Sequence, residues 1–106
     1  MFIYVFIGDL FYARRLEVPT ISMFYGILVS MYVFDAEKHH LPHIHIRYNE
    51  FKVVVEIPSG AVLEGSIPSR QMKLVQAWLE LHQDELMADW FLATNGQTPF
   101  KIDPLR

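Results

Sequence analysis

A cluster of histidines lies near the middle of the chain. Four of the protein's five histidines fall within one stretch, His39-His40-Leu41-Pro42-His43-Ile44-His45. Residues two apart on a β-strand project from the same face, so His43 and His45 could place two imidazole rings on one metal ion. A divalent metal such as zinc would suit these ligands. A third ligand could be one of three side chains: His39, His40 or Glu56.

The same stretch could also act without a metal. Imidazole titrates near neutral pH, so His43 and His45 could serve as a general acid and a general base. Arg47 and Lys52 would then hold a phosphate group, in outline as in metal-independent RNA cleavage. The net charge of −3 and the pI near 5.9 count against broad nucleic-acid binding, which normally needs a basic surface.

A structural role is a third interpretation of the cluster. Pro42 would rigidify the entry to a strand, and the histidines would hydrogen-bond the neighbouring backbone and Glu56. His82 lies in an apolar helical stripe, where a histidine is more often a core or boundary residue than a ligand. The spacing alone leaves all three interpretations open, and it does not show whether His82 approaches His43.

Two alternating segments must position the cluster. Residues 43–48 alternate between polar and apolar side chains, and residues 51–57 repeat the alternation. Asn49-Glu50 between them suits a tight turn, because asparagine tolerates the left-handed conformation. A two-residue loop pairs Tyr48 with Phe51 and makes the apolar faces coincide. The other face would then carry His43, His45, Arg47, Lys52 and Glu56.

This register also sets two cations side by side. Arg47 would lie directly opposite Lys52, and like charges in that arrangement are destabilising. The pair is mildly unfavourable unless an anion or a carboxylate lies there, so it is a small hint of a site and also a small reason to question the register.

The segments before and after these strands supply further elements. Residues 2–7 predict a short strand, and residues 10–18 predict a helical turn or a linker. The almost continuously apolar residues 24–34 predict a central strand covered on both faces, in which Gly26 indicates a bulge or a close backbone approach. Residues 61–67 predict another strand, whose register the pattern leaves undecided.

A helical region follows. Pro68-Ser69 suits a helix start, and apolar residues then recur every three or four positions to about Thr94. Asn95-Gly96 is a stop signal, and the proline-containing tail after it should be extended. The region predicts either one long helix or two short helices with a break near Gln83-Asp84.

This order of elements predicts an α+β fold. We expect a curled antiparallel β-sheet of about four strands, to which residues 2–7 could add one, with one long or two short C-terminal helices packed on one face. The length of 106 residues and the 52% apolar share suit one domain, which we place at residues 19–106 behind an N-terminal extension, residues 1–18.

Composition excludes several classes of protein. The chain has no cysteine, which removes disulfide frameworks, thiol catalysis and cysteine-based zinc fingers. The apolar run of residues 1–7 is too short to span a membrane and lacks the flanks of a signal peptide. We therefore expect a soluble cytoplasmic protein that does not insert into membranes.

Several motifs together resemble a known family. They are Pro19-Thr20-Ile21-Ser22-Met23-Phe24-Tyr25-Gly26, Met31-Tyr32, the histidine stretch with Tyr48, Leu63-Glu64-Gly65, Trp78, Leu81-His82, Glu85-Leu86, Asp89-Trp90 and residues 99–105. Over about residues 19–106 the chain resembles the bacterial domain of unknown function (DUF) 4160 family. The family's Pro-His-x-His motif would map onto Pro42, His43 and His45, and a variant with an added His-His onto His39 and His40. No established activity comes with the resemblance.

The resemblance implies a partner. Members of this family are often encoded beside a second small protein, in an arrangement similar to a toxin–antitoxin pair. The leading hypothesis is a component of such a module that acts through a small protein partner encoded nearby, with the histidine cluster as its functional surface. One alternative is a small hydrolase or ribonuclease. Another is a purely structural interaction domain whose sheet edge recruits a partner strand, and the sequence is also compatible with a homodimer.

Overall fold

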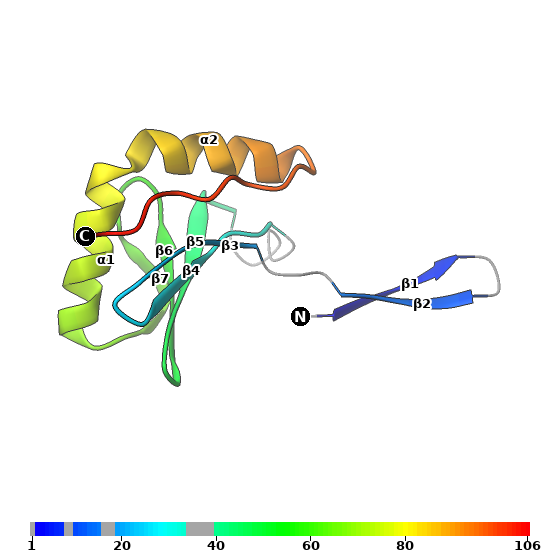
Figure 1. The fold of residues 1–106 in the computed structure, drawn as a ribbon, viewed down its shortest axis with the longest axis horizontal. Coiled ribbons are helices and arrows are strands. Elements are labelled where there is room, and N and C mark those ends of the chain that lie inside the picture. Colours follow the sequence, from blue (N-terminus) through cyan, green and yellow to red (C-terminus); the bar gives the residue numbers. More distant parts are fainter. Residues whose placement is uncertain (1, 8–9, 16–18, 34–39) are drawn as a thin grey trace.

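The computed structural model describes residues 2–7, 10–15, 19–33 and 40–106, and it confirms the α+β fold. Strands β1 and β2 pair antiparallel in a small sheet of their own, and five further strands form an antiparallel sheet in the order β3-β4-β5-β6-β7 (Figure 1). Two helices follow. The elements are β1 Phe2–Ile7, β2 Leu10–Arg15, β3 Thr20–Phe24, β4 Ile27–Ser30, β5 His43–Tyr48, β6 Phe51–Glu56, β7 Val62–Ser66, α1 Ser69–Leu81 and α2 Gln83–Thr94.

The apolar segment after Pro19 forms a hairpin, so the prediction of one central strand over residues 24–34 was wrong. β3 ends at Phe24, β4 begins at Ile27, and these two residues pair with each other. Tyr25 and Gly26 between them have φ angles of 49° and 77°. Two successive positive φ angles reverse the chain in a tight hairpin turn. The apolar residues on both sides of Tyr25 hide this turn in the sequence, and residue 34 itself lies outside the described residues.

The N-terminal segments also differ in part from the prediction. Residues 2–7 form the predicted strand, β1, but residues 10–15 form a second strand instead of a helical turn or a linker. The two strands pair along their whole length, from Phe2 opposite Arg15 to Ile7 opposite Leu10.

The central hairpin has the predicted register. Tyr48 pairs with Phe51 and His43 with Glu56, so every pair between β5 and β6 matches the alternation of the sequence. Asn49 begins the turn with a φ angle of 52°, which is the left-handed conformation expected of it.

A bulge sets the register of β7, which the sequence left undecided. Val54 pairs with Glu64 whereas Val55 pairs with Val62, so Leu63 is one extra residue in β7. Gly65 has a φ angle of 78°, and a Cβ atom there would lie 2.3 Å from the carbonyl oxygen of Lys52. Only glycine permits this close approach of the two backbones.

The helical region is divided into two helices. α1 ends at Leu81 and α2 begins at Gln83, with His82 between them, so the predicted break is present but lies slightly earlier. Pro68 is the residue before the first helical turn, and Ser69 is its first residue. α2 ends at Thr94, as the Asn95-Gly96 signal predicted, and Gly96 has a φ angle of 76°.

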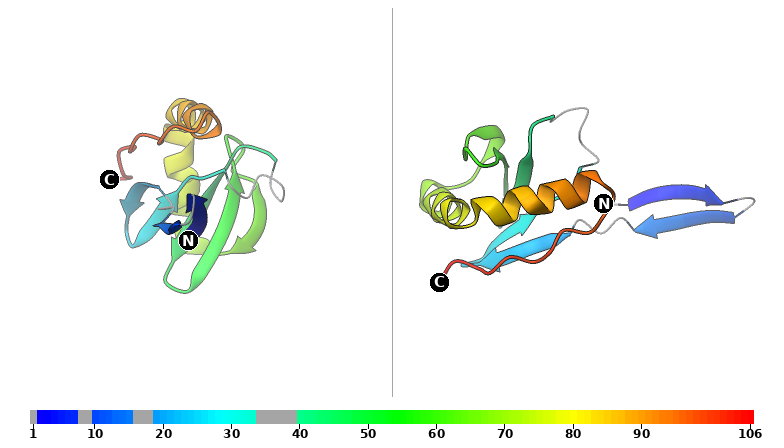
Figure 2. Two further views of the ribbon diagram at one scale, coloured as in Figure 1. Left: turned by 90° about the vertical axis from the view of Figure 1, so that its right-hand side faces the viewer. Right: turned by 90° about the horizontal axis from the view of Figure 1, so that it is seen from above.

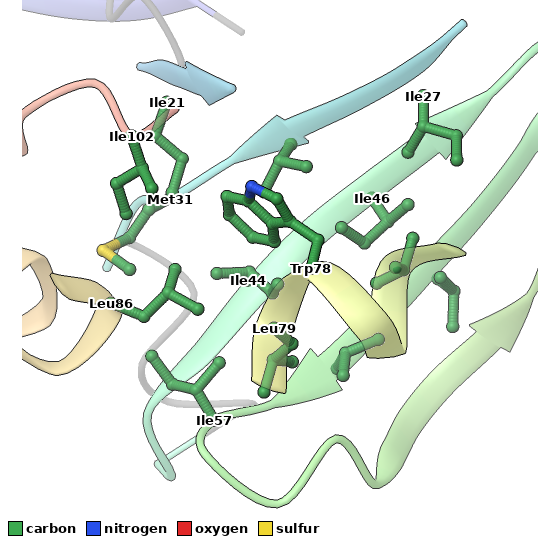
Figure 3. Packing of buried hydrophobic residues seen from close by; sticks show 14 of the residues in the cluster. Ile21, Ile27, Met31, Ile44, Ile46, Ile57, Trp78, Leu79, Leu86 and Ile102 are labelled. Carbon is green, nitrogen blue, oxygen red and sulfur yellow. The ribbon is translucent and has the colours of Figure 1, made fainter. Parts of the chain in front are cut away.

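The core lies between the sheet and α1. Figures 1 and 2 show α1 against one face of the five-stranded sheet and α2 across the end at which β5 begins. Trp78 of α1 is completely buried over Ile44 and Ile46 of β5, and its ring lies 5.4 Å from that of Phe24 (Figure 3). Leu86 of α2 closes the core at the end of the sheet.

The extended tail after α2 returns along β3 (Figure 2). The amide of Ile102 donates to the carbonyl of Ile21 at 2.8 Å, and the indole N–H of Trp78 donates to the carbonyl of Asp103 at 2.7 Å. The tail therefore covers one edge of the sheet and ties α1 to it. No helix in the described part of the chain is long and apolar enough to cross a membrane.

Candidate functional site

The β5–β6 hairpin has two faces of different character. Ile44, Ile46, Val53 and Val55 point toward the helices and are buried in the core. We call the opposite side of the sheet the histidine face. One cross-strand row on it consists of Ser30, His45, Val54 and Glu64, and the next row consists of Leu28, Arg47, Lys52 and Ser66.

His43 is part of the fold's interior. Its side chain is 0% exposed, and its Nδ1 atom lies 2.6 Å from the carbonyl oxygen of Leu41. Because a carbonyl can only accept, Nδ1 carries the proton and donates it. The ring also lies 5.0 Å from the ring of Trp90 and 5.2 Å from that of His45. His43 therefore joins β5 to α2, and solvent does not reach it.

His45 is the more accessible of the two predicted acid–base residues. It is partly buried, and its ring stacks on Tyr32 with 3.9 Å between centroids and 15° between planes. The Tyr32 hydroxyl lies 2.8 Å from Nδ1 of His45. Tyr32, His45, His43 and Trp90 thus form a continuous series of ring contacts.

The predicted metal ligands are not gathered into one centre by the residues that the structure describes. Among those residues, no three His, Cys, Asp or Glu side chains are placed to hold a metal ion. His40 is exposed, and the carboxylate of Glu56 accepts a hydrogen bond from the hydroxyl of Ser59. His39 lies outside the described residues, so a site that includes it stays a prediction.

Arg47 and Lys52 lie side by side, as the register predicted. Both side chains are exposed, and they are direct partners across β5 and β6. Arg47 donates from Nε to the carbonyl of Asn49 at 3.4 Å. No carboxylate in the described part of the chain forms an ion pair with either cation. The histidine face therefore carries two adjacent positive charges that the described residues do not neutralise.

His82 has a local role at the helix junction. Its Nδ1 atom lies 2.6 Å from a carboxylate oxygen of Glu85, and its ring is 5.4 Å from that of Trp78. These contacts belong to α1 and α2, in agreement with the interpretation of His82 as a boundary residue of the helical stripe.

Asp89, which the sequence indicated only as part of the Asp89-Trp90 motif, is a buried carboxylate. It is 3% exposed, and its Oδ1 atom accepts the amide of Phe100 at 2.8 Å, while Oδ2 has no hydrogen-bond partner among the described residues. Burial raises the pKa of Asp89, the Phe100 amide lowers it, and the negative charge of Glu85 raises it further. Its spacing from the buried residues Leu86 and Ala93 could have indicated a buried position.

An open pocket of about 480 Å³ lies elsewhere, between the β3–β4 turn, the start of α1 and the tail. It is lined by Tyr25, Arg70, Gln71, Leu74, Leu105 and Arg106. None of the predicted site residues lines this pocket. Its walls come from three segments that are distant in the sequence.

Comparison with known families adds a classification. The model of the family described as Domain of unknown function (DUF4160) matches residues 26–91. The chain belongs to this family. The match runs from the β3–β4 turn to Phe91 of α2, so it includes the histidine face and most of both helices, and it confirms the resemblance seen in the sequence. Comparison with curated proteins and comparison with solved structures each found no match.

Proposed function

We propose that this DUF4160 protein is a cytoplasmic component of a bacterial two-protein module of the toxin–antitoxin type and acts by binding a small protein partner. The observation that carries the proposal is the outer face of α2. Phe91 is 62% exposed there and Met87 is 37% exposed, although the opposite side of the same helix is buried in the core.

A helix that is apolar on two sides is typically covered on two sides. Met87 and Phe91 are four residues apart, so they lie on one face of α2 and form a single apolar contact surface. Leu86 and Ala93 are buried beneath the helix. Removing a large aromatic side chain from water is strongly favourable, so this outer face supports an interaction with another macromolecule.

Charge indicates the chemistry of that partner. Glu80, Asp84 and Glu85 are exposed near the junction of α1 and α2. The chain has no Lys or Arg between Lys73 and Lys101. A basic segment with apolar side chains, such as an amphipathic helix of the partner, would be complementary to this acidic and apolar surface.

Co-expression with the product of the adjacent gene tests the proposal. The complex is purified and its dissociation constant measured by calorimetry for the wild type and for Phe91→Glu. A charge in the apolar centre of the contact should weaken binding by more than about tenfold.

Phe51→Glu is the matched control, because Phe51 is a partly exposed phenylalanine at the β5–β6 turn. It should leave binding unchanged. Equal binding by wild type and Phe91→Glu would contradict the proposal, as would an equal loss in both variants. Self-association of the chain through Phe91, with no binding of the adjacent gene's product, would also overturn it.

The contact between Tyr32 and His45 favours a second candidate, hydrolysis of a phosphate ester or of RNA. A partly exposed imidazole beside a phenol hydroxyl is suited to general acid–base catalysis, whereas buried His43 would only position it. RNA cleavage by the wild type that is lost in His45→Gln, with the protein still folded, would support this candidate. Equal activity in both proteins would contradict it.

A further inference from the structure

We propose that Arg47, Lys52 and Ser66 on the histidine face form a binding site for the phosphate group of a phosphate ester, with His45 beside it. This site is separate from the outer face of α2 and does not depend on partner binding. Three features support it: the register of β5, β6 and β7, the two cations that this register brings together, and the close fit of the backbone around them.

The register places three hydrogen-bond donors in one row. Arg47 of β5 is paired with Lys52 of β6, and Lys52 is paired with Ser66 of β7. Direct partners in an antiparallel sheet have Cβ atoms only about 5 Å apart and point to the same face. All three side chains are exposed, so their guanidinium, ammonium and hydroxyl groups can converge on one ligand.

The two adjacent positive charges in this row favour the binding of an anion. Arg47 and Lys52 repel each other, and no carboxylate in the described part of the chain pairs with either of them. An anion bound between them adds two attractions, which together outweigh the repulsion that remains between the two cations. Arginine offers a planar fork that matches phosphate oxygens and lysine offers a point charge, so the pair suits a phosphate better than it suits a single carboxylate.

The backbone around the row is closely fitted. Because Gly65 has no side chain, β7 can approach the carbonyl of Lys52, where a Cβ atom would lie only 2.3 Å away. This approach brings Ser66 level with Lys52. On the other side, the hydrogen bond from Arg47 to the carbonyl of Asn49 holds the guanidinium near the hairpin turn.

His45 extends the site toward the centre of the sheet. It lies two residues before Arg47 on β5, so both side chains project from the same face. Stacking against Tyr32 fixes the plane of its ring. A phosphate ester held by Arg47 and Lys52 would therefore present its organic group toward an aromatic surface, which free inorganic phosphate does not use.

Titration of ¹⁵N-labelled protein with inorganic phosphate at low ionic strength tests the site. We expect saturable shifts of the amide resonances of residues 45–47, 52 and 66, with a dissociation constant of about 1 mM for so exposed a site. Lys52→Gln should weaken binding by about threefold to tenfold, because it removes one charge-assisted hydrogen bond.

Lys73→Gln is the matched control, because Lys73 is an exposed lysine on α1, outside the row. It should leave binding unchanged, and the spectra show directly whether each variant is folded. Absence of saturable shifts at these residues, or an equal loss in Lys73→Gln, would overturn the proposal.

Two further ligands identify the source of the phosphate. Adenosine monophosphate and a short single-stranded RNA are compared at equal phosphate concentration. Binding of RNA much more tightly than the mononucleotide identifies a nucleic-acid ligand, and equal binding identifies a small phosphate ester. Phe91→Glu should bind phosphate like the wild type, so failure of the partner proposal leaves this result interpretable.

Discussion

Successive side chains of β5 and β6 point to opposite faces of the hairpin, and these two faces differ in burial and in charge. Toward α1 lie Ile44, Ile46, Val53 and Val55, all buried in the hydrophobic core. On the histidine face, Arg47 and Lys52 are exposed and repel each other. The comparison indicates that one face stabilises the fold, whereas the other carries groups that stability alone does not explain.

The two faces meet at the first residue of β5. By alternation His43 belongs to the histidine face, but α2 crosses that end of the sheet and buries it against Trp90. His45, two residues later, keeps part of its surface accessible. Position along the strand therefore decides which histidine is structural and which is available to a ligand.

The largest expected effect lies on the core face. Trp78→Ala removes a completely buried indole that packs on β5 and holds the tail through Asp103. Loss of this packing should lower the free energy of unfolding by about 3–5 kcal/mol. Urea denaturation followed by circular dichroism measures the change.

Phe91→Ala is the control for that measurement, because Phe91 is an aromatic residue on the outer surface of α2. It should change the free energy of unfolding by no more than about 0.5 kcal/mol. An equal decrease in the free energy of unfolding for the two variants would contradict the conclusion that Trp78 is packed in the core whereas Phe91 is exposed to solvent.

At Asp89 we expect an intermediate effect on the free energy of unfolding, and its size depends on pH. Burial raises the pKa of its carboxyl in the folded state above 3.8, so as pH rises the unfolded chain releases this proton first. The contribution of Asp89 to stability is therefore present below pH 3.8 and is lost as pH rises through the folded-state pKa. Asp89→Asn should remove this loss of stability between acidic and neutral pH, because an amide side chain does not titrate in this range.

Unfolding curves between pH 3 and pH 7 test this expectation, with Asp84→Asn as the control because Asp84 is an exposed aspartate of the same helix. The control should keep the pH dependence of the wild type. An unchanged pH dependence in Asp89→Asn would show that the buried carboxylate does not destabilise the folded state.

The smallest change in the free energy of unfolding is expected on the histidine face. It is an increase, in contrast with the loss expected for Trp78→Ala. Lys52→Glu turns the repulsion with Arg47 into an attraction, so the free energy of unfolding should increase by about 0.2–1 kcal/mol. Thermal denaturation at low salt, compared with Lys73→Glu, measures it. A loss of stability greater than that of Lys73→Glu would mean that the cation pair contributes to the fold and would weaken the comparison between the faces.

Local sequence signals determined the central hairpin and the helices. The period-two alternation of residues 43–48 and 51–57, together with Asn49 in a left-handed turn, predicted the register of β5 and β6 completely. The three-and-four spacing of apolar residues and the Asn95-Gly96 stop likewise predicted the helical region and its end. These features follow from interactions between residues that are close in the sequence.

Only the tertiary structure decided which of the predicted site residues are buried in the fold and which are accessible to a ligand. Tyr32 stacks on His45, Trp90 covers His43 and Gly65 approaches Lys52, and none of these pairs has a periodic signal in the sequence. The hairpin turn at Tyr25-Gly26 was hidden for a related reason, because its flanks are apolar on both sides. The alternation of polar and apolar residues predicts which side of a strand a residue faces. Its burial depends on which element, distant in the sequence, packs over that side.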